Sequence, residues 1–178
     1  MDTTFQKKDF LVKEFLLFSI NAGLQTRGYP VYLINRKESS DLRVDIKNFL
    51  IQYVQEFDAS TEKKHYDTIE LMSKLISQNH SKILINGRFR IGISQKIINL
   101  FLKYMWTAGQ IKMPFHCPFD SIIKAKLLKG VTNVFLKDWT ILDSLEDYDK
   151  YVVLARHKAD EMNLTIAEWE LVNFERRK

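Results

Sequence analysis

The stretch from residue 93 to residue 108 most constrains the fold of this chain, because its pattern fits one kind of element. Apolar side chains recur around nearly the whole circumference of a helix, at Ile93, Ile97, Ile98, Leu100, Phe101, Leu102, Tyr104, Met105 and Trp106. A helix that is apolar on most sides is typically buried. We therefore expect a central helix here, with the other elements packed around it.

One narrow polar line interrupts this helix. Lys96, Asn99, Lys103 and Thr107 are spaced at i, i+3, i+7 and i+11, which places them on one side of the helix. The line is either an outward edge that carries two solvated lysines or the wall of a cleft. In a cleft with apolar walls, desolvation would lower the pKa of a lysine and leave its amine partly neutral and nucleophilic.

Helical periodicity and helix-end signals predict six further helices, at about residues 5–22, 42–57, 61–78, 121–129, 144–162 and 165–175. Four of them begin with capping residues: Ser39-Ser40-Asp41, Ser60 or Thr61, Asp120 or Ser121, and Thr165 in a capping box with Glu168. Asn86-Gly87 lies between two short apolar segments and predicts a β-hairpin. The predicted class is mainly α, a single all-α domain over residues 1–178 with about seven helices and at most one short β-hairpin.

Composition narrows the class of protein further. A chain of 178 residues with one cysteine, Cys117, can form a core without a disulfide or metal, and it fits a reducing cytoplasm. No apolar run approaches the roughly 20 residues of a membrane span, and residues 1–10 lack a signal peptide. We expect a cytoplasmic protein with no membrane partner, cofactor or metal. His116 and Cys117 are neighbours that point apart, so a buried thiol is expected rather than a nucleophile or metal ligand.

Basic residues are concentrated in the middle of the chain. Between Asn79 and Lys137 there are ten Lys or Arg residues and one carboxylate, Asp120, whereas the remainder carries 17 basic and 21 acidic residues. Such a segment offers a positive surface to a polyanion, most often a nucleic acid. Its candidate phosphate contacts are Arg88, Arg90, Lys112, Lys124, Lys126 and Lys129. Each of them could equally be a solvated surface side chain.

Two short motifs in this segment resemble a known family. Gly92-Ile-Ser-Gln-Lys96, followed by a helix and by Cys117-Pro-Phe-Asp120 at the start of the next helix, resembles the helix-hairpin-helix DNA glycosylase/lyases of the 8-oxoguanine type. In that family a lysine follows the hairpin glycine, and an aspartate ends a Val-Pro-Val-Asp-like turn. The archaeal members carry a second lysine seven residues after the first, as Lys103 follows Lys96. Ser94 departs from the pattern, because the family has a second glycine there.

The resemblance implies a base-excision repair enzyme of helix-hairpin-helix fold that acts on an oxidised base such as 8-oxoguanine in duplex DNA. Lys96 would attack the sugar C1′ as the base leaves and form a Schiff base. Asp120 would stabilise positive charge on the sugar and help to deprotonate the lysine. Further DNA contacts would come from Gly92, Ser94, Gln95 and Lys103. A base extruded from the stack also needs an aromatic partner, for which the candidates are Trp106, Phe115, Trp139 and Trp169.

Two other functions fit the same residues. The first is a non-catalytic helical protein that binds DNA or RNA through the basic stretch 82–129. The second is a protein-interaction module whose uneven charge drives self-association. The sequence leaves the oligomeric state open.

Overall fold

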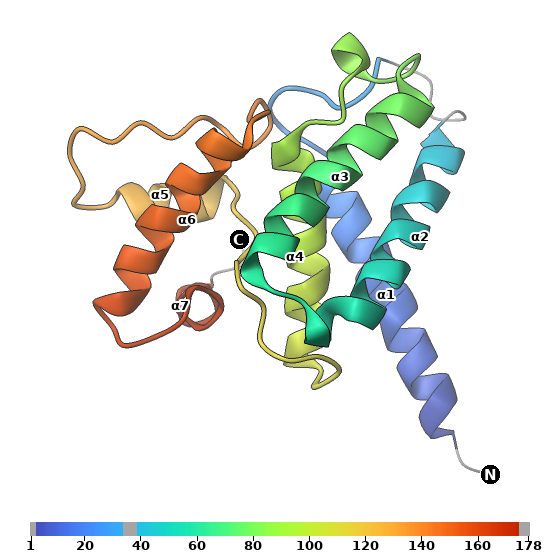
Figure 1. Cartoon of the computed structure of the whole chain (residues 1–178), viewed down its shortest axis with the longest axis horizontal. Coiled ribbons are helices and arrows are strands. Elements are labelled where there is room, and N and C mark those ends of the chain that lie inside the picture. The colour runs from blue at the N-terminus through green and yellow to red at the C-terminus, as the bar shows by residue number, and fades with distance from the viewer. Residues whose placement is uncertain (1–2, 34–38, 175–178) are drawn as a thin grey trace.

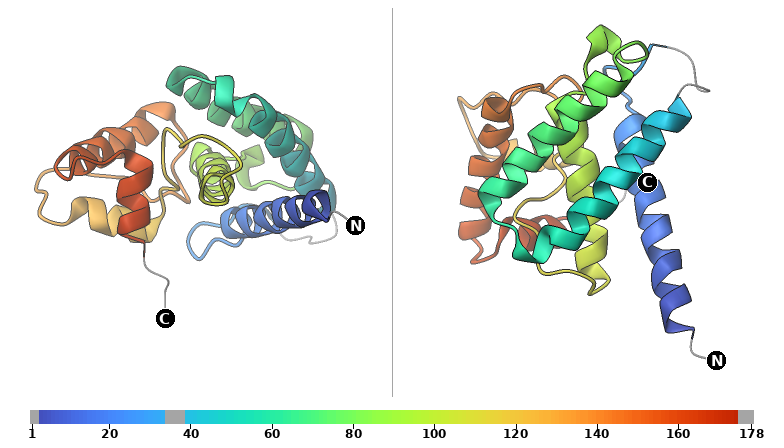
Figure 2. Two further views of the ribbon diagram at one scale, coloured as in Figure 1. Left: turned by 90° about the horizontal axis from the view of Figure 1, so that it is seen from below. Right: turned by 45° about the vertical axis from the view of Figure 1, so that its right-hand side comes forward.

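Helix α4 (Ile91–Thr107) lies at the centre of the molecule, as the view along it in Figure 2 shows. The computed structural model describes residues 3–33 and 39–174, and 14 of the 17 residues of α4 are buried. The prediction of a buried central helix is confirmed. Because α4 is apolar on most sides, the surrounding helices can bury their own apolar faces against it.

The other helices lie on two sides of α4 (Figure 1). On one side are α1 (Thr4–Leu24), α2 (Ser39–Glu56) and α3 (Glu62–His80), and on the other are α5 (Ser121–Leu128), α6 (Leu145–Asp160) and α7 (Ile166–Val172). Two 3₁₀ turns, η1 (Phe57–Ala59) and η2 (Ile85–Gly87), complete the described elements. The mainly-α class and the seven helices are confirmed within the described ranges. Every predicted helix boundary there agrees within three residues, and residue 175 lies outside them.

Local capping explains where three of these helices begin. The Thr61 hydroxyl accepts a hydrogen bond from the Lys64 amide, and the Asp120 carboxylate caps α5. Thr165 and Glu168 form both hydrogen bonds of a capping box at the start of α7. Such caps depend on residues within one turn of each other, and this is why the sequence alone located them.

The predicted β-hairpin at Asn86-Gly87 does not form. Both residues have positive φ, 54° and 65°, as the tight turn requires. The segment before the turn, however, pairs through an isolated antiparallel bridge with the chain near Tyr32, and not with the segment after the turn. The segment after the turn is held by two arginines that bind the loop between α5 and α6, described below.

Small residues let α1 approach α4 closely. A Cβ atom on Gly23 would lie 2.2 Å from the Ile97 side chain, so any larger residue would require Ile97 to move. Ser19 and Ser94 are fully buried. The close contact places residues 25–28, which follow α1, beside the first turns of α4.

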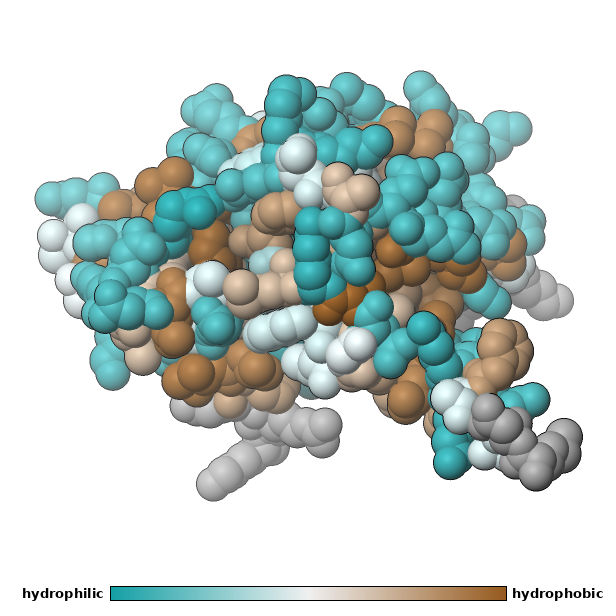
Figure 3. Space-filling model, turned by 60° about the horizontal axis from the view of Figure 1, so that its bottom comes forward, coloured by the Kyte–Doolittle hydropathy of each residue, from teal (hydrophilic) through white to brown (hydrophobic). Residues whose placement is uncertain are grey.

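The N-terminal end of α1 extends beyond the other helices, and Phe5 and Phe10 are exposed on it (Figures 1 and 2). On the face shown in Figure 3, the apolar side chains form several patches, and hydrophilic side chains lie between these patches. No helix within residues 3–33 or 39–174 combines the length and the apolar character needed to cross a bilayer.

Candidate active site

The first turn of α4 is covered by the loop between α5 and α6. The Gly92 amide donates a hydrogen bond to the Leu142 carbonyl at 2.8 Å. A Cβ atom at position 92 would lie 1.8 Å from the Trp139 carbonyl oxygen. Glycine is therefore needed here for the close approach of two backbone segments, and its amide is already engaged within the chain.

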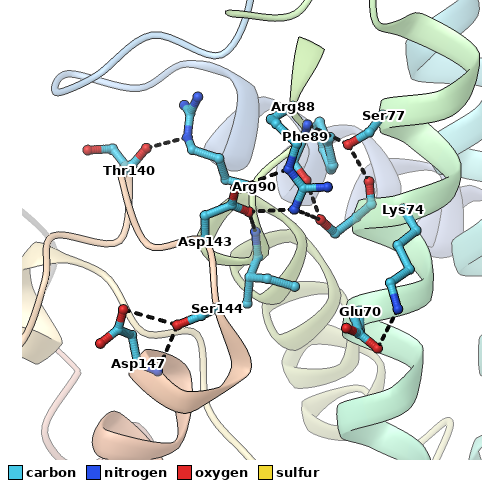
Figure 4. A network of polar contacts seen from close by, with 12 residues as sticks. Glu70, Lys74, Ser77, Arg88, Phe89, Arg90, Thr140, Asp143, Ser144 and Asp147 are labelled. Atoms are coloured by element: carbon cyan, nitrogen blue, oxygen red, sulfur yellow. Dashed lines mark hydrogen bonds and ion pairs between the residues drawn. The ribbon is translucent and has the colours of Figure 1, made fainter. Parts of the chain in front are cut away.

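Arg88 and Arg90 fasten the same loop to α4 (Figure 4). Arg88 donates two hydrogen bonds to the Asp143 carboxylate, at 3.0 and 2.8 Å. Arg90 is 5% exposed and donates to the Thr140 carbonyl at 2.6 Å and to the Pro30 carbonyl at 2.7 Å. These arginines connect three parts of the chain. Arg90 in particular satisfies buried carbonyls, a structural role that the charge pattern did not reveal.

The side chains of Ser94 and Gln95 are fully buried as well. The motif that begins at Gly92 is therefore packed in the interior and does not form a protruding hairpin. The interpretation of Arg90, Gly92, Ser94 and Gln95 as direct contacts to nucleic acid is corrected on this ground. These buried residues instead position the segments that line the site.

Lys96 and Asp120 form an ion pair, with 2.6 Å between the lysine Nζ and the carboxylate Oδ2. The side chains are 9% and 24% exposed. The other carboxylate oxygen, Oδ1, accepts the Ile122 and Ile123 amides at 2.9 and 3.1 Å and so caps α5. Asp120 thus caps a helix with one oxygen and contacts the lysine with the other, the dual arrangement that the sequence suggested.

Burial raises the pKa of Asp120, but the charge and hydrogen bond of Lys96, together with the two backbone amides, outweigh it and hold the pKa below its usual value. The carboxylate is therefore ionised at neutral pH. The ionised Asp120 carboxylate is the base in direct contact with the Lys96 ammonium group.

Two amide side chains of α4 hold the turn that carries Asp120. Gln95 donates to the Phe119 carbonyl at 2.7 Å and accepts from the Phe119 amide at 3.2 Å. One turn later, Asn99 donates to the Cys117 carbonyl at 2.9 Å. The turn is thus hydrogen-bonded directly to α4, which fixes Asp120 against Lys96. No pattern in the sequence indicated this role for Gln95.

The ion pair lies in the wall of an open cavity of about 490 Å³, within the range of small-ligand pockets. Three segments line it: the end of α1 with residues 25–28, the start of α5, and residues 138–140. Arg27 and Asp138 add one positive and one negative side chain. The polar line of α4 therefore faces a cavity at Lys96, and the interpretation as a solvated outer edge is wrong there.

The cavity distinguishes between the four aromatic candidates. Trp139 lines it together with Lys96. Phe115 lines a different cavity of about 510 Å³ that contains neither Lys96 nor Asp120, and Trp169 is buried in the core. Trp106 lies near the far end of α4. Trp139 is thus the candidate that shares the cavity with the ion pair.

The second lysine of the polar line is also paired inside the protein. Lys103 Nζ lies 2.6 Å from the Glu170 carboxylate, and the two side chains are 10% and 3% exposed. Burial raises the pKa of Glu170, an effect that the nearby Lys103 opposes. Lys103 was predicted to contact nucleic acid. Its position corrects that interpretation, because the ammonium group is directed into the interior between α4 and α7.

Besides Arg88, whose side chain is 40% exposed, four predicted contact residues remain near the surface. Lys112 and Lys129 are exposed, and Lys124 and Lys126 are partly buried. Lys124 lies 2.7 Å from the exposed Asp138, whereas the Lys112 ammonium group donates to the Asp58 carbonyl. Three of the four lie on or directly after α5, whose first residues line the cavity that contains Lys96.

Behind the site lies a buried polar network that the sequence did not reveal. His65 contacts Tyr53 and Asn99, at 2.8 Å each, and Asn99 donates to the Tyr148 hydroxyl at 3.1 Å. That hydroxyl is 2.7 Å from His116. Single histidines without spacing carry no signal in a sequence, and these partners come from four different helices and a loop.

Cys117 is buried, and burial raises the pKa of its thiol well above the usual value. The expectation of a buried thiol is confirmed. No three His, Cys, Asp or Glu side chains in the described part of the chain are grouped so that they could hold a metal ion. Comparisons of the chain with protein-family models, with curated proteins and with solved structures gave no match.

Proposed function

We propose that this protein binds damaged duplex DNA and removes an oxidised base such as 8-oxoguanine, as a DNA glycosylase with lyase activity. The observation that carries the proposal is the Lys96–Asp120 pair in the wall of an open cavity, 2.6 Å apart. Attack on a sugar carbon requires an amine, a proton acceptor in contact with that amine, and a partly desolvated site. Trp139 lines the same cavity and is the aromatic residue that we propose to stack on an extruded base.

In the proposed reaction the Lys96 ammonium first transfers a proton to Asp120. The amine lone pair then attacks C1′, the bond from C1′ to the base nitrogen breaks, and the base leaves with the bonding electrons and takes up a proton. Opening of the sugar ring breaks the bond from C1′ to O4′ and leaves an iminium between Lys96 and C1′, with O4′ protonated. The three protons of the ammonium group are thus shared between the base, O4′ and the iminium. In the lyase step C2′ loses a proton and the 3′ phosphate departs.

Borohydride trapping tests the proposal directly. Hydride reduces the iminium to a stable secondary amine, so a covalent protein–DNA adduct appears on a denaturing gel. We expect an adduct on duplex oligonucleotides that contain 8-oxoguanine or an abasic site, and none with Lys96→Gln. Lys74→Gln is the matched control, because Lys74 is an exposed lysine paired with Glu70 on α3. An adduct of equal yield in Lys96→Gln would overturn the assignment.

Asp120 permits a sharper test, because its two roles can be separated. Asparagine caps a helix about as well as aspartate, so Asp120→Asn keeps the cap and removes the proton acceptor. We expect adduct formation to slow by about 10²-fold or more, while the melting temperature stays closer to that of the wild type than in Asp120→Ala. Equal rates in wild type and Asp120→Asn would remove the carboxylate from the mechanism.

The same assays identify the alternative function. Binding to DNA or RNA without an adduct on any lesion would favour a non-catalytic nucleic-acid-binding protein that uses Lys124, Lys126 and Lys129. Phosphate contacts predict that binding weakens steeply as the salt concentration rises. Concentration-dependent self-association without binding to nucleic acid would favour a protein-interaction module.

A further inference from the structure

Arg27 is the only charged residue in the wall of the Lys96 cavity that has no partner in the described part of the chain. The wall contains four charged residues: Arg27, Lys96, Asp120 and Asp138. Lys96 is paired with Asp120, and Asp138 is paired with Lys124 at 2.7 Å. The exposed Arg27 side chain forms neither an ion pair nor a hydrogen bond with any described residue. The unpaired charge of the cavity is therefore positive, and it favours an anionic ligand.

The turn that carries Arg27 is fixed at its far end. The Thr26 hydroxyl donates a hydrogen bond to the Tyr29 carbonyl at 3.0 Å, and the Tyr29 amide donates to the Thr140 hydroxyl at 3.3 Å. The Arg90 guanidinium also lies over the Tyr29 ring, 4.9 Å from its centroid. A cation on a fixed backbone loses less conformational freedom on binding an anion than a cation on a mobile segment does.

An unpaired guanidinium and a nucleophilic amine in one cavity fit a ligand that has both an anionic group and an electrophilic carbon. Arginine binds phosphate through parallel, charge-assisted hydrogen bonds. The sugar that Lys96 attacks in the proposed reaction carries a phosphate on its 3′ side and another on its 5′ side. The 3′ phosphate departs in the lyase step, so only the 5′ phosphate can be held throughout the reaction.

We propose that this cavity binds a sugar 5-phosphate, with the phosphate at Arg27 and the reacting carbon C1 at Lys96. The inference rests on the proposed function and names the part of the substrate that Arg27 recognises. Two sources supply this chemistry, an abasic site in DNA and free 2-deoxyribose 5-phosphate. With the free sugar, the Lys96 amine attacks the open-chain aldehyde at C1. The aldehyde oxygen takes two of the three ammonium protons and leaves as water, and an iminium remains.

Borohydride trapping of free sugars tests the phosphate contact, with the adduct measured by mass spectrometry. The substrates are 2-deoxyribose 5-phosphate and 5-O-methyl-2-deoxyribose, neither of which can close to a six-membered ring. We expect Arg27→Gln to slow trapping of the phosphate by about tenfold or more and to leave trapping of the methyl ether unchanged. Arg27→Lys should recover part of the rate, because the charge is retained. Lys82→Gln is the charge-matched control, since Lys82 is exposed and does not line the cavity.

An abasic oligonucleotide distinguishes the two sources. If Arg27 holds the 5′ phosphodiester, an uncharged methylphosphonate at that position slows trapping by the wild type about as much as Arg27→Gln does, and it slows the variant no further. An effect of Arg27→Gln on the oligonucleotide alone assigns the contact to DNA, and an effect on the free sugar alone assigns it to a small sugar phosphate. Equal rates for wild type and Arg27→Gln on both substrates would overturn the proposal.

A binding measurement separates this inference from the proposed function. Ribitol 5-phosphate has no carbonyl group and cannot react with Lys96. In a calorimetric titration the wild type should bind it about tenfold more tightly than Arg27→Gln does, with equal melting temperatures because Arg27 is exposed. If the wild type forms no adduct with any substrate, the lysine chemistry of the proposed function fails, and the titration alone decides on Arg27. Equal affinities would then overturn the phosphate site as well.

Discussion

The folded chain is expected to lose stability between pH 7 and pH 5, because His65 is held neutral in the core. His65 is fully buried, with Nδ1 2.8 Å from the Tyr53 hydroxyl and Nε2 2.8 Å from the side-chain oxygen Oδ1 of Asn99. This pairing is satisfied by the neutral ring when Nε2 donates and Nδ1 accepts. Burial, reinforced by the charge of His116, lowers the pKa of His65 to about 3.

The sign and size of the effect follow from proton linkage. In the unfolded chain a histidine has a pKa near 6.5, so below that pH the unfolded state binds a proton that the folded state does not. The stability that the neutral ring contributes is complete above pH 6.5 and is lost as the pH falls toward 3. Between pH 7 and pH 5 the loss from His65 alone amounts to about 2 kcal/mol of unfolding free energy.

Urea unfolding of the wild type and of His65→Gln at pH 7, 6 and 5 measures the contribution of His65 to the pH dependence of the unfolding free energy. The variant is less stable throughout, but its unfolding free energy should decline with acidity by about 2 kcal/mol less than that of the wild type. Groups that do not interact with His65 cancel in the comparison, whereas His116, whose own pKa burial lowers, contributes to the decline of both proteins. The pKa of Glu62, which hydrogen bonding to His116 lowers to about 2, affects stability only at lower pH. Parallel pH profiles of the two proteins would refute the reasoning.

Three further substitutions probe the packing around the site. Gly92→Ala should cost about 1–3 kcal/mol in urea unfolding, because the new Cβ would lie 1.8 Å from the Trp139 carbonyl oxygen; an unchanged midpoint would show that the loop is not packed there. Lys103→Met should cost about 3–5 kcal/mol, since it leaves the Glu170 carboxylate buried without its partner, and Lys103→Met with Glu170→Leu should recover much of that loss. If the double variant is as unstable as the single one, the buried charge is not the cause. Thr165→Ala should lower the unfolding free energy by about 1 kcal/mol through loss of the capping box, and thermal unfolding without any shift would contradict this.

The sequence predicted the helices well because their signals are local. Apolar periodicity and caps such as Thr165 with Glu168 involve residues a few positions apart, and they located every helix in the described ranges within three residues. The tight turn at Asn86-Gly87 was equally local and correct in its backbone conformation. Which segment pairs beside that turn is not local, and there the hairpin prediction failed.

The site shows the same division between local and distant signals. The motif suggested that Lys96 and Asp120 act together, and the structure brings them into contact. No pattern indicated that Glu170, in the last described helix, would pair with Lys103. The need for glycine at position 92 is set by the Trp139 backbone, 47 positions later in the chain. Partners so far apart can be known only once the helices are packed.

The concentration of basic residues also acquires a different meaning in the folded chain. At least five of the ten, including Lys96 and Lys103, form ion pairs with carboxylates. All but one of these carboxylates lie outside the basic segment, so folding brings four carboxylates to a segment with nine excess positive charges and reduces its charge imbalance. A basic sequence segment is therefore weak support for nucleic-acid binding in this protein. The functional argument instead depends on geometry, namely an amine and a carboxylate that share the wall of an open cavity.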